Sequence, residues 1–152
     1  MHSVLFVCTA NICRSPMAMA LLRARIAHSQ EAWRIESAGT WALLSRPAAE
    51  KTRQVLEQQG IDVSDHLSRP VTRELLDSFN LILTMERGHK EALQVEFPDL
   101  AGRVYTLTEM VAGFGDIEDP IGGSLEAFEA TYEEIDQILE QGFDKIKRLS
   151  AS

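Results

Sequence analysis

The chain of 152 residues contains only two cysteines, Cys8 and Cys13, which lie five positions apart. Such a pair provides no disulfide framework for an extracellular fold, and without a second Cys/His pair at ligand spacing it makes a poor zinc site. No apolar run approaches the length of a membrane span, and the N-terminus lacks the basic start and the cleavage site of a signal peptide. These absences predict a cytoplasmic protein.

Basic residues are also scarce, because 15 Lys and Arg stand against 23 Asp and Glu, for a net charge of −8. This balance argues against a nucleic-acid partner and against an anionic membrane surface, so any anion site must be a local pocket. The composition, 45% hydrophobic and 25% charged, is that of an ordinary globular protein. The length predicts one domain, residues 1–152, with a substantial core.

Apolar and helical patterns alternate along the chain. Strands are predicted at residues 4–7, 33–37, 80–85 and 104–107. Helices are predicted at residues 16–28, 48–59, 72–79 and 87–97, and as one long final helix from Ser124 whose apolar residues continue to Leu149 in a single buried stripe. This alternation predicts an α/β fold of three layers, a parallel sheet covered by helices on both faces, in which ligands bind beyond the carboxyl ends of the strands.

The first strand leads into the stretch that carries the chemistry. Cys8 follows the strand directly, and Arg14, Ser15 and Pro16 stand where the first helix begins. A strand-to-helix turn directs several backbone N–H groups and the positive end of the helix dipole into one small space, which favours an anion. We therefore predict a phosphate-binding loop after strand 1, in which the same field favours the thiolate form of Cys8.

These residues support phosphoryl transfer. The Cys8 thiolate would attack phosphorus in line, and the planar guanidinium of Arg14 would bind two phosphate oxygens at once. Ser15 is expected within hydrogen-bonding distance of the Cys8 sulfur, where its hydroxyl would stabilise the thiolate. The alternative interpretation is that Cys8 is only a small buried residue at the end of a strand, but this leaves Arg14 and Ser15 at the helix start unexplained.

The leaving group needs a proton, and Asp119 is the predicted general acid. It precedes Pro120, which biases its backbone toward an extended conformation and so fixes the direction of its side chain. Asp116 and Glu118 are its competitors within the loop 113–123, which contains four glycines and three acids and is typical of a functional loop.

Two further positions have alternative roles. Trp41 begins an apolar cluster that either packs into the core or lines a pocket wall. His66 stands in a polar segment, and we expect it to support the phosphate loop through a hydrogen bond rather than to act as a catalytic base.

The sequence resembles the low-molecular-weight protein tyrosine phosphatases in four places. These are the loop Val-Cys-x-x-Asn-Ile-Cys-Arg-Ser-Pro at 7–16, Ser-Ala-Gly-Thr at 37–40, His66 with Arg69, and Asp119 with Pro120. The resemblance implies a four-stranded parallel sheet, no metal and no cofactor, a phosphorylated protein or peptide as substrate, and inorganic phosphate as product.

The resemblance also implies roles for individual residues. Cys8 is the nucleophile, Arg14 the phosphate-binding arginine and Asp119 the general acid, while Cys13 forms a reversible disulfide with the nucleophile under oxidation. The residues that hold the loop are Asn11, Ser15, Ser37 and His66. The substrate-binding set is Thr9, Ala10, Asn11, Ile12, Cys13, Ser15, Trp41 and Ile121.

Several positions depart from the family's pattern. Ala10 replaces a usual glycine, at a cost of about 1–2 kcal/mol if a positive φ is needed there. Ile12 is the tyrosine-type residue, whereas Asp-Pro-x-Gly-Gly-Ser at 119–124 is more similar to the bacterial protein-arginine phosphatases, and Ile121 replaces the aromatic residues of eukaryotic members. We predict a phosphatase for phosphotyrosine-type phosphomonoesters, with a protein-arginine phosphatase as the alternative.

Three rival functions share parts of this pattern. Arsenate reductases on this fold need further cysteines downstream, and none follows Cys13. A non-catalytic phosphate-binding module has no need of a cysteine in the loop. A phosphocysteine carrier domain would keep Cys8 without needing Arg14 and Asp119 together.

Overall fold

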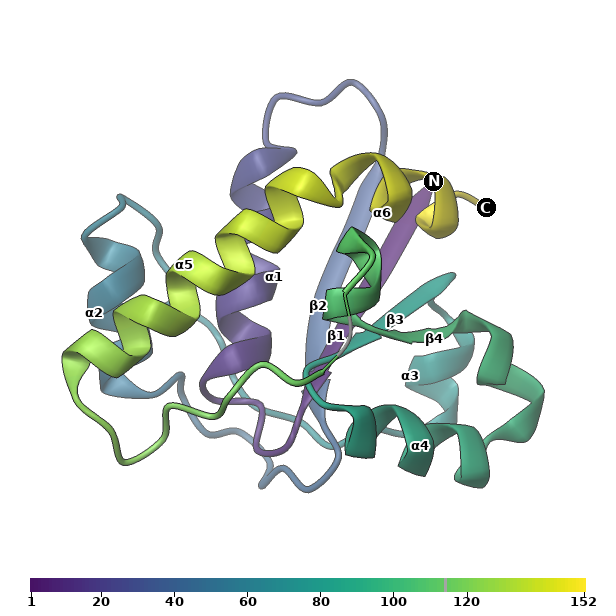
Figure 1. Ribbon diagram of the computed structural model, residues 1–152, viewed down its shortest axis with the longest axis horizontal. Coiled ribbons are helices and arrows are strands. Elements are labelled where there is room, and N and C mark those ends of the chain that lie inside the picture. The colour runs from purple at the N-terminus through teal and green to yellow at the C-terminus, as the bar shows by residue number, and fades with distance from the viewer. Residues whose placement is uncertain (114) are drawn as a thin grey trace.

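The computed structural model describes residues 1–113 and 115–152 (Figure 1). Phe114, in the predicted functional loop, lies outside the described residues. In chain order the elements are β1 (His2–Cys8), α1 (Arg14–Arg25), β2 (Trp33–Gly39), α2 (Glu50–Glu57), α3 (Arg73–Asp77), β3 (Leu81–Thr84), α4 (Arg87–Glu96), the 3₁₀ helix η1 (Pro98–Arg103), β4 (Val104–Thr106), the 3₁₀ helix η2 (Leu107–Val111), α5 (Leu125–Gln141) and α6 (Phe143–Ser150).

The four strands form one parallel sheet in the order β2-β1-β3-β4. β1 lies in the centre and every one of its residues is buried, as expected for a strand covered on both faces. The predicted α/β fold with a four-stranded parallel sheet is confirmed.

Successive residues of β1 point to opposite faces of the sheet. Val4 and Phe6 join a large apolar cluster built with α1, α2, α5 and α6. Leu5 and Val7 join a smaller cluster with residues of α3, α4 and η1. Helices therefore cover both faces, which gives the three layers that the alternation of strands and helices predicts.

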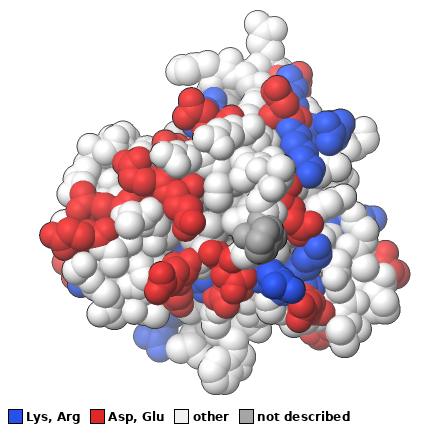
Figure 2. Space-filling model, in the orientation of Figure 1, with Lys and Arg blue, Asp and Glu red and all other residues white. Residues whose placement is uncertain are grey.

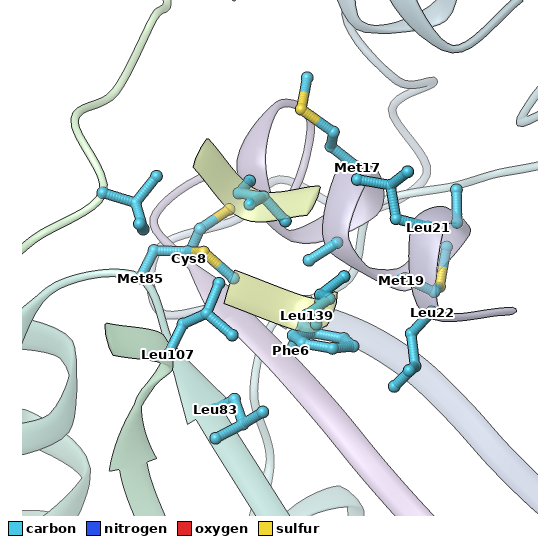
Figure 3. Packing of buried hydrophobic residues seen from close by; sticks show 14 of the residues in the cluster. Phe6, Cys8, Met17, Met19, Leu21, Leu22, Leu83, Met85, Leu107 and Leu139 are labelled. Atoms are coloured by element: carbon cyan, nitrogen blue, oxygen red, sulfur yellow. The ribbon is translucent and has the colours of Figure 1, made fainter. Parts of the chain in front are cut away.

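The larger core extends up to the end of β1. Figure 3 shows Cys8 beside Met85 and Leu107, and Phe6 beside Leu139 of α5. Cys8 is 2% exposed, so its thiol stands at the boundary between this core and the loop of residues 9–13. The contacts with Met85 and Leu107 thus fix the position of the sulfur on its core side.

The prediction of a single final helix is wrong, because the helix is interrupted at Gly142 between α5 and α6. A Cβ at Gly142 would lie 2.8 Å from the Cβ of Met110 and 2.9 Å from its carbonyl oxygen, so η2 presses directly on the backbone here. The apolar spacing continues across the break because both helices pack on the same cluster.

The remaining predicted elements are present, and each of their ends lies within three residues of the predicted position. The largest displacement is in α1, which begins at Arg14 rather than Pro16 and ends at Arg25 rather than His28. The two 3₁₀ helices η1 and η2 were not predicted. Among the described residues, the structure contains no helix with the length and apolar character needed to span a bilayer.

Candidate active site

The loop between β1 and α1 turns through Asn11, which has φ of 60°. This left-handed conformation is tolerated by asparagine better than by most residues other than glycine. Ala10 does not have a positive φ, so the cost considered for an alanine there does not arise.

Asn11 is completely buried, and its side chain connects the loop to three other parts of the site. Its Nδ2 donates to Ser15 Oγ at 2.8 Å and to Ser37 Oγ at 2.9 Å. Its Oδ1 accepts a hydrogen bond from the backbone N–H of Arg69 at 3.1 Å. The predicted supporting residue Ser37 is thus in direct contact with the loop, through the end of β2.

His66 supports the same residue from a second segment. Its Nε2 lies 2.8 Å from the carbonyl oxygen of Asn11, and since a carbonyl only accepts, Nε2 carries the proton. Burial lowers the pKa of His66, although the Asn11 carbonyl opposes this shift. The imidazole is therefore a neutral, buried donor to the loop backbone, which fits a support and not a catalytic base.

The end of β2 lies unusually close to the loop. Gly39 is the residue of closest approach, because a Cβ there would lie 2.4 Å from the carbonyl oxygen of Thr9. The backbone N–H groups of Thr40 and Trp41 then donate to the carbonyl oxygens of Cys8 and Thr9, each at 2.9 Å. The motif at 37–40 is accordingly a platform for the phosphate loop.

Cys8 and Ser15 form a hydrogen bond of 2.9 Å between Sγ and Oγ. Because the Ser15 oxygen already accepts from Asn11, its single proton is free to point at the sulfur. Ser37, Asn11, Ser15 and Cys8 are thereby joined in one buried series of polar contacts.

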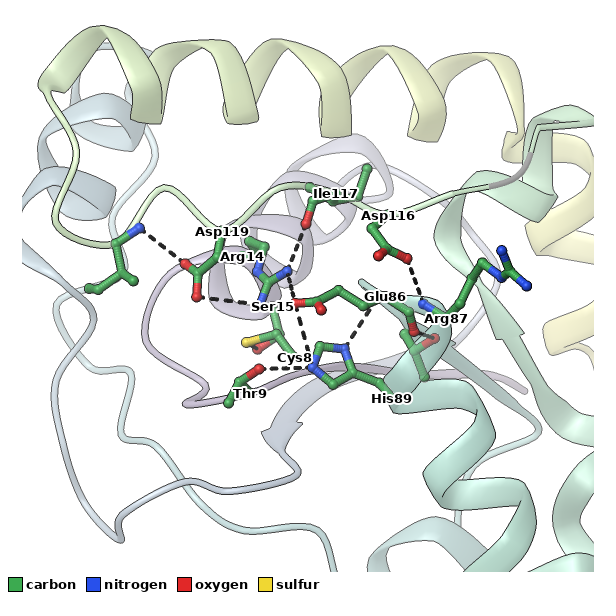
Figure 4. A network of polar contacts seen from close by, with 12 residues as sticks. Cys8, Thr9, Arg14, Ser15, Glu86, Arg87, His89, Asp116, Ile117 and Asp119 are labelled. Carbon is green, nitrogen blue, oxygen red and sulfur yellow. Dashed lines mark hydrogen bonds and ion pairs between the residues drawn. The ribbon is translucent and has the colours of Figure 1, made fainter.

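Arg14 is the first residue of α1 and is only 1% exposed (Figure 4). Its Nη1 donates to Glu86 Oε2 at 2.6 Å and to the carbonyl oxygen of Ile117 at 2.7 Å. Its Nη2 lies 3.5 Å from Asp119 Oδ2, and its buried Nε has no partner among the described residues. Both N–H groups of Nη1 are thus used, and the edge formed by Nε and Nη2, whose only contact among the described residues is the longer one to Asp119, can bind a ligand.

Of the three acids in the loop before α5, the structure brings Asp119 to Arg14. Asp119 Oδ1 also accepts from the backbone N–H of Ile121 at 3.0 Å, which fixes the carboxylate. Asp116 is used elsewhere, because its Oδ1 accepts from the N–H of Arg87 at 2.7 Å. Glu118 shares a pocket with Glu134 of α5; burial first, and then Glu118, raise the pKa of Glu134.

Sequence reasoning missed two residues of the site, Glu86 and His89 (Figure 4). Glu86 follows β3 and is the N-cap of α4, and His89 completes a capping box with it. His89 Nε2 lies 2.8 Å from Thr9 Oγ1 in the phosphate loop. The available signal was an acid directly after a buried strand, since the carboxyl ends of neighbouring parallel strands meet at one edge.

The predicted substrate-binding residues divide into two groups. The side chains of Asn11, Cys13 and Ser15 are buried, and burial raises the pKa of the Cys13 thiol to about 12, with Asp119 and Cys8 adding to the effect. Trp41 is 86% exposed and lines a cavity of about 470 Å³ with Ala10 and Ile12. Trp41 was expected either to pack into the core or to line a pocket wall, and it lines the pocket wall. Ile121 borders a different hollow, beside Asp119 and α5.

Acidic side chains cover much of the molecular face that carries this site. Figure 2 shows them along α5 and over the segment that leads into it. The few basic side chains on that face include those near the start of α4. The buried cation of Arg14 therefore lies beneath a surface of opposite sign.

The family model described as low molecular weight phosphotyrosine protein phosphatase matches residues 3–151 of the chain. The chain belongs to this family. The family membership expected from the motifs is confirmed, and with it the class of enzyme, a phosphatase.

Similar proteins carry two different substrate names. A protein-arginine-phosphatase of Geobacillus stearothermophilus is 35% identical over 147 residues, which cover 96% of this chain and 97% of that protein. A probable low molecular weight protein-tyrosine-phosphatase, EpsP, of Ralstonia nicotianae is 37% identical over 147 residues and 97% of each chain.

A solved structure adds a chemical observation. It is a cysteine-to-serine mutant of the arginine phosphatase YwlE with a phosphorylated active-site serine, and it is 33% identical to this chain. The TM-score is 0.90, and the match covers 96% of each chain. In that relative the residue that replaces the cysteine carries the phosphoryl group.

Proposed function

We propose that the protein hydrolyses phosphotyrosine-type phosphomonoesters on proteins or peptides through a phosphocysteine intermediate at Cys8. The observation that carries the proposal is the buried guanidinium of Arg14, whose Nη1 is saturated by Glu86 and Ile117 while Nε has no partner among the described residues. An arginine held in this way offers a fixed, two-pronged donor to a phosphate.

In the first step the substrate phosphate lies in the loop of residues 9–13, between its backbone N–H groups and the free edge of Arg14. The Cys8 thiolate attacks phosphorus, the S–P bond forms and the bond from phosphorus to the leaving oxygen breaks. The Arg14 guanidinium and the N–H groups stabilise the charge on the equatorial oxygens. Asp119, in its protonated form, donates its proton to the leaving oxygen.

In the second step the Asp119 carboxylate takes a proton from a water molecule, whose oxygen attacks the phosphocysteine. The P–S bond breaks, and the Cys8 thiolate returns with its hydrogen bond from Ser15. Inorganic phosphate is the product and leaves from the same donors that bound the substrate. A phosphorylated nucleophile position in a relative supports this covalent route.

The cavity beside the loop supports an aryl group on the substrate. Its lining of Ala10, Ile12, Trp41, Ala42 and Leu43 is apolar, with Arg46 at the border. The face of an aromatic ring packs well against exposed Trp41. Among the described residues that line this cavity there is no carboxylate to pair with the N–H groups of a phosphoarginine.

A second candidate is dephosphorylation of phosphoarginine in proteins. It is favoured by the 35% identity to the Geobacillus arginine phosphatase and by the acidic surface over the segment that leads into α5, which would attract a basic peptide (Figure 2). The two candidates share the same phosphate loop and differ only in the group that leaves.

We also propose that the protein works in the cytoplasm. Cys8 must be a free thiolate to react, and the neighbouring Cys13 is likewise a free thiol. A reducing compartment keeps both in this form.

The test is hydrolysis of a phosphotyrosyl and a phosphoarginyl peptide of the same sequence, without metal, by the wild type and by Cys8→Ser. Faster release of phosphate from phosphotyrosine supports the proposal, and faster release from phosphoarginine supports the second candidate. Cys8→Ser should lose turnover while it still binds inorganic phosphate. Unchanged turnover of this variant would refute the nucleophile assignment.

A further inference from the structure

We propose that His89 is a positioning residue, which clamps both ends of the phosphate loop to the start of α4 through its neutral, Nε2-protonated imidazole. The proposal rests on the proposed function in one respect, because it takes Arg14 as the phosphate ligand. At one end of the loop Thr9 is bonded to His89 itself, and directly after the other end Arg14 is bonded to Glu86 (Figure 4).

The tautomer follows from the partners of the ring. His89 is 7% exposed, and its Nδ1 lies 3.1 Å from the backbone nitrogen of Glu86. A backbone N–H only donates, so Nδ1 is the acceptor and carries no proton. In the neutral ring the proton is then on Nε2, which donates to Thr9 Oγ1 at 2.8 Å.

The other half of the clamp is the side chain of Glu86. Its carboxylate accepts from Arg14 Nη1 at 2.6 Å and also from the backbone N–H of His89, in a capping box at the first turn of α4. His89 thus holds Glu86 at two points, by its ring at the Glu86 N–H and by its own N–H at the carboxylate. Glu86 in turn fixes the saturated edge of Arg14, which determines where the free edge points.

The segment before α5 is tied to the same helix start. Ile117 donates its N–H to the carbonyl oxygen of Met85 at 2.8 Å, and Asp116 caps the N–H of Arg87. The second acceptor of Arg14, the Ile117 carbonyl, is therefore positioned by the same turn. The start of α4 acts as a common anchor for the loop, the arginine and the segment that carries Asp119.

Protonation of His89 would open this clamp, because a proton on Nδ1 would face the N–H of Glu86, and two donors do not bond. The charged groups around the ring are Glu86, Arg14, Asp116 and Asp119. Burial, with Arg14, lowers the pKa of His89 against the opposing effect of the three acids. The clamp is accordingly closed near neutral pH.

Two variants separate the clamp from simple filling of space. His89→Gln retains an acceptor for the Glu86 N–H, as glutamine does at this position of capping boxes, and a donor for Thr9. His89→Phe keeps a ring of similar size and loses both bonds. His28→Gln is the matched control, since His28 is exposed beyond the end of α1.

The expected losses follow from the two hydrogen bonds. We expect His89→Phe to lower kcat/KM about tenfold or more and to weaken binding of inorganic phosphate, as the loss of two bonds implies. His89→Gln should stay within about threefold of the wild type, the equivalent of less than one bond. Because the pKa of His89 lies below the ordinary histidine value of about 6.5, the ratio of wild-type to His89→Gln kcat/KM should hold near neutral pH and fall only as the pH drops through that lowered pKa. Equal losses in both variants, or a ratio that does not change with pH, would overturn the proposal.

Nitrogen NMR of the wild-type protein tests the tautomer directly and needs no variant that must fold. The expected spectrum of neutral His89 has a protonated Nε2 and an unprotonated Nδ1, and the reverse tautomer would refute the clamp. The NMR result and the phosphate affinity do not depend on turnover. Absence of phosphatase activity in the wild type would therefore count against the proposed function and leave these two measurements to decide the role of His89.

Discussion

The hydroxyl oxygen of Ser15 lies 2.9 Å from the sulfur of Cys8 and 2.8 Å from the amide nitrogen of Asn11. Since the amide nitrogen donates, the hydroxyl proton is free to point at the sulfur, and toward a Cys8 thiolate, which has no proton, Ser15 is the donor. Both side chains are buried, so water does not compete for this contact. A negative charge on sulfur thus has one donor that is oriented before any substrate arrives.

Ser15→Ala removes this donor. We expect kcat to fall about tenfold or more, as for a lost bond to a charged group, with little change in KM, because Arg14 and the backbone still bind the phosphate. Steady-state kinetics with an aryl phosphate, together with the rate of Cys8 alkylation by iodoacetamide, measure the effect. Ser64→Ala, at an exposed serine, is the control, and an equal fall in that variant would contradict the assignment.

Asp119→Ala removes the proposed general acid. We expect hydrolysis of a poor leaving group such as phenyl phosphate to slow by about 10²-fold or more, and that of dinitrophenyl phosphate much less, because a good leaving group needs no proton. The measurement is kcat across a series of aryl phosphates of decreasing leaving-group basicity. Glu118→Gln, in the same segment, should leave the dependence unchanged. Uniform slowing across the series in Asp119→Ala would exclude the acid role.

The buried histidines predict a dependence of stability on pH. Burial lowers the pKa of His66 and of His89 in the folded protein, so near pH 6 the unfolded chain binds more protons. The contribution of these two histidines to the free energy of unfolding is present above about pH 6.5, the ordinary pKa of histidine. It is lost as the pH falls toward their lower pKa values in the folded protein. Urea unfolding at a series of pH values between about 5.5 and 7.5 should show stability rising with pH.

Substitution separates the part due to His66. His66→Gln should reduce the slope of unfolding free energy against pH, whereas His28→Gln, at an exposed site, should not. An unchanged slope in His66→Gln would show that this imidazole has the same proton affinity in both states.

Oxidation should join Cys8 to Cys13. Peroxide converts the Cys8 thiolate to a sulfenic acid, and the Cys13 thiol then displaces water to form the disulfide. Because burial raises the pKa of the Cys13 thiol to about 12, Cys8 is the cysteine that peroxide attacks first. Peptide mapping without reductant should find the linked pair, and dithiothreitol should restore activity. In Cys13→Ala the same treatment should carry Cys8 to the irreversible sulfinic acid, and equal overoxidation of the wild type would contradict the pairing.

The part of the site that residue patterns alone predict is local in sequence, whereas Ser37 is expected as a supporting residue from the family resemblance, and His66 from its polar segment and that resemblance. Cys8, Arg14 and Ser15 lie within one turn between a strand and a helix, and this spacing, together with the buried strand before it and the helix after it, predicts that they surround one anion. The alternation of strands and helices predicts the sheet, and the edge where its strands end predicts the location of the site.

What could not be predicted depends on contacts between distant segments. The bond between Arg14 and Glu86 spans 72 positions, and that between Thr9 and His89 spans 80. The capping box with Glu86 at the N-cap and His89 at N3 departs from the usual pattern of a hydroxyl residue at the N-cap and an acid or glutamine at N3. The break at Gly142 is explained by the close approach of Met110 from η2. The helical periodicity within residues 124–149 contains no sign of this contact.

The acidic face of Figure 2 has a consequence for diffusion toward the enzyme. With a net charge of −8, the protein repels a small doubly charged aryl phosphate before it reaches Arg14. At physiological ionic strength, mobile ions screen such repulsion beyond roughly 8 Å. Added salt should therefore speed the capture of small phosphates and slow that of peptides rich in lysine and arginine. We therefore expect the surface to discriminate among substrates by their total charge, before they are close enough to contact the loop.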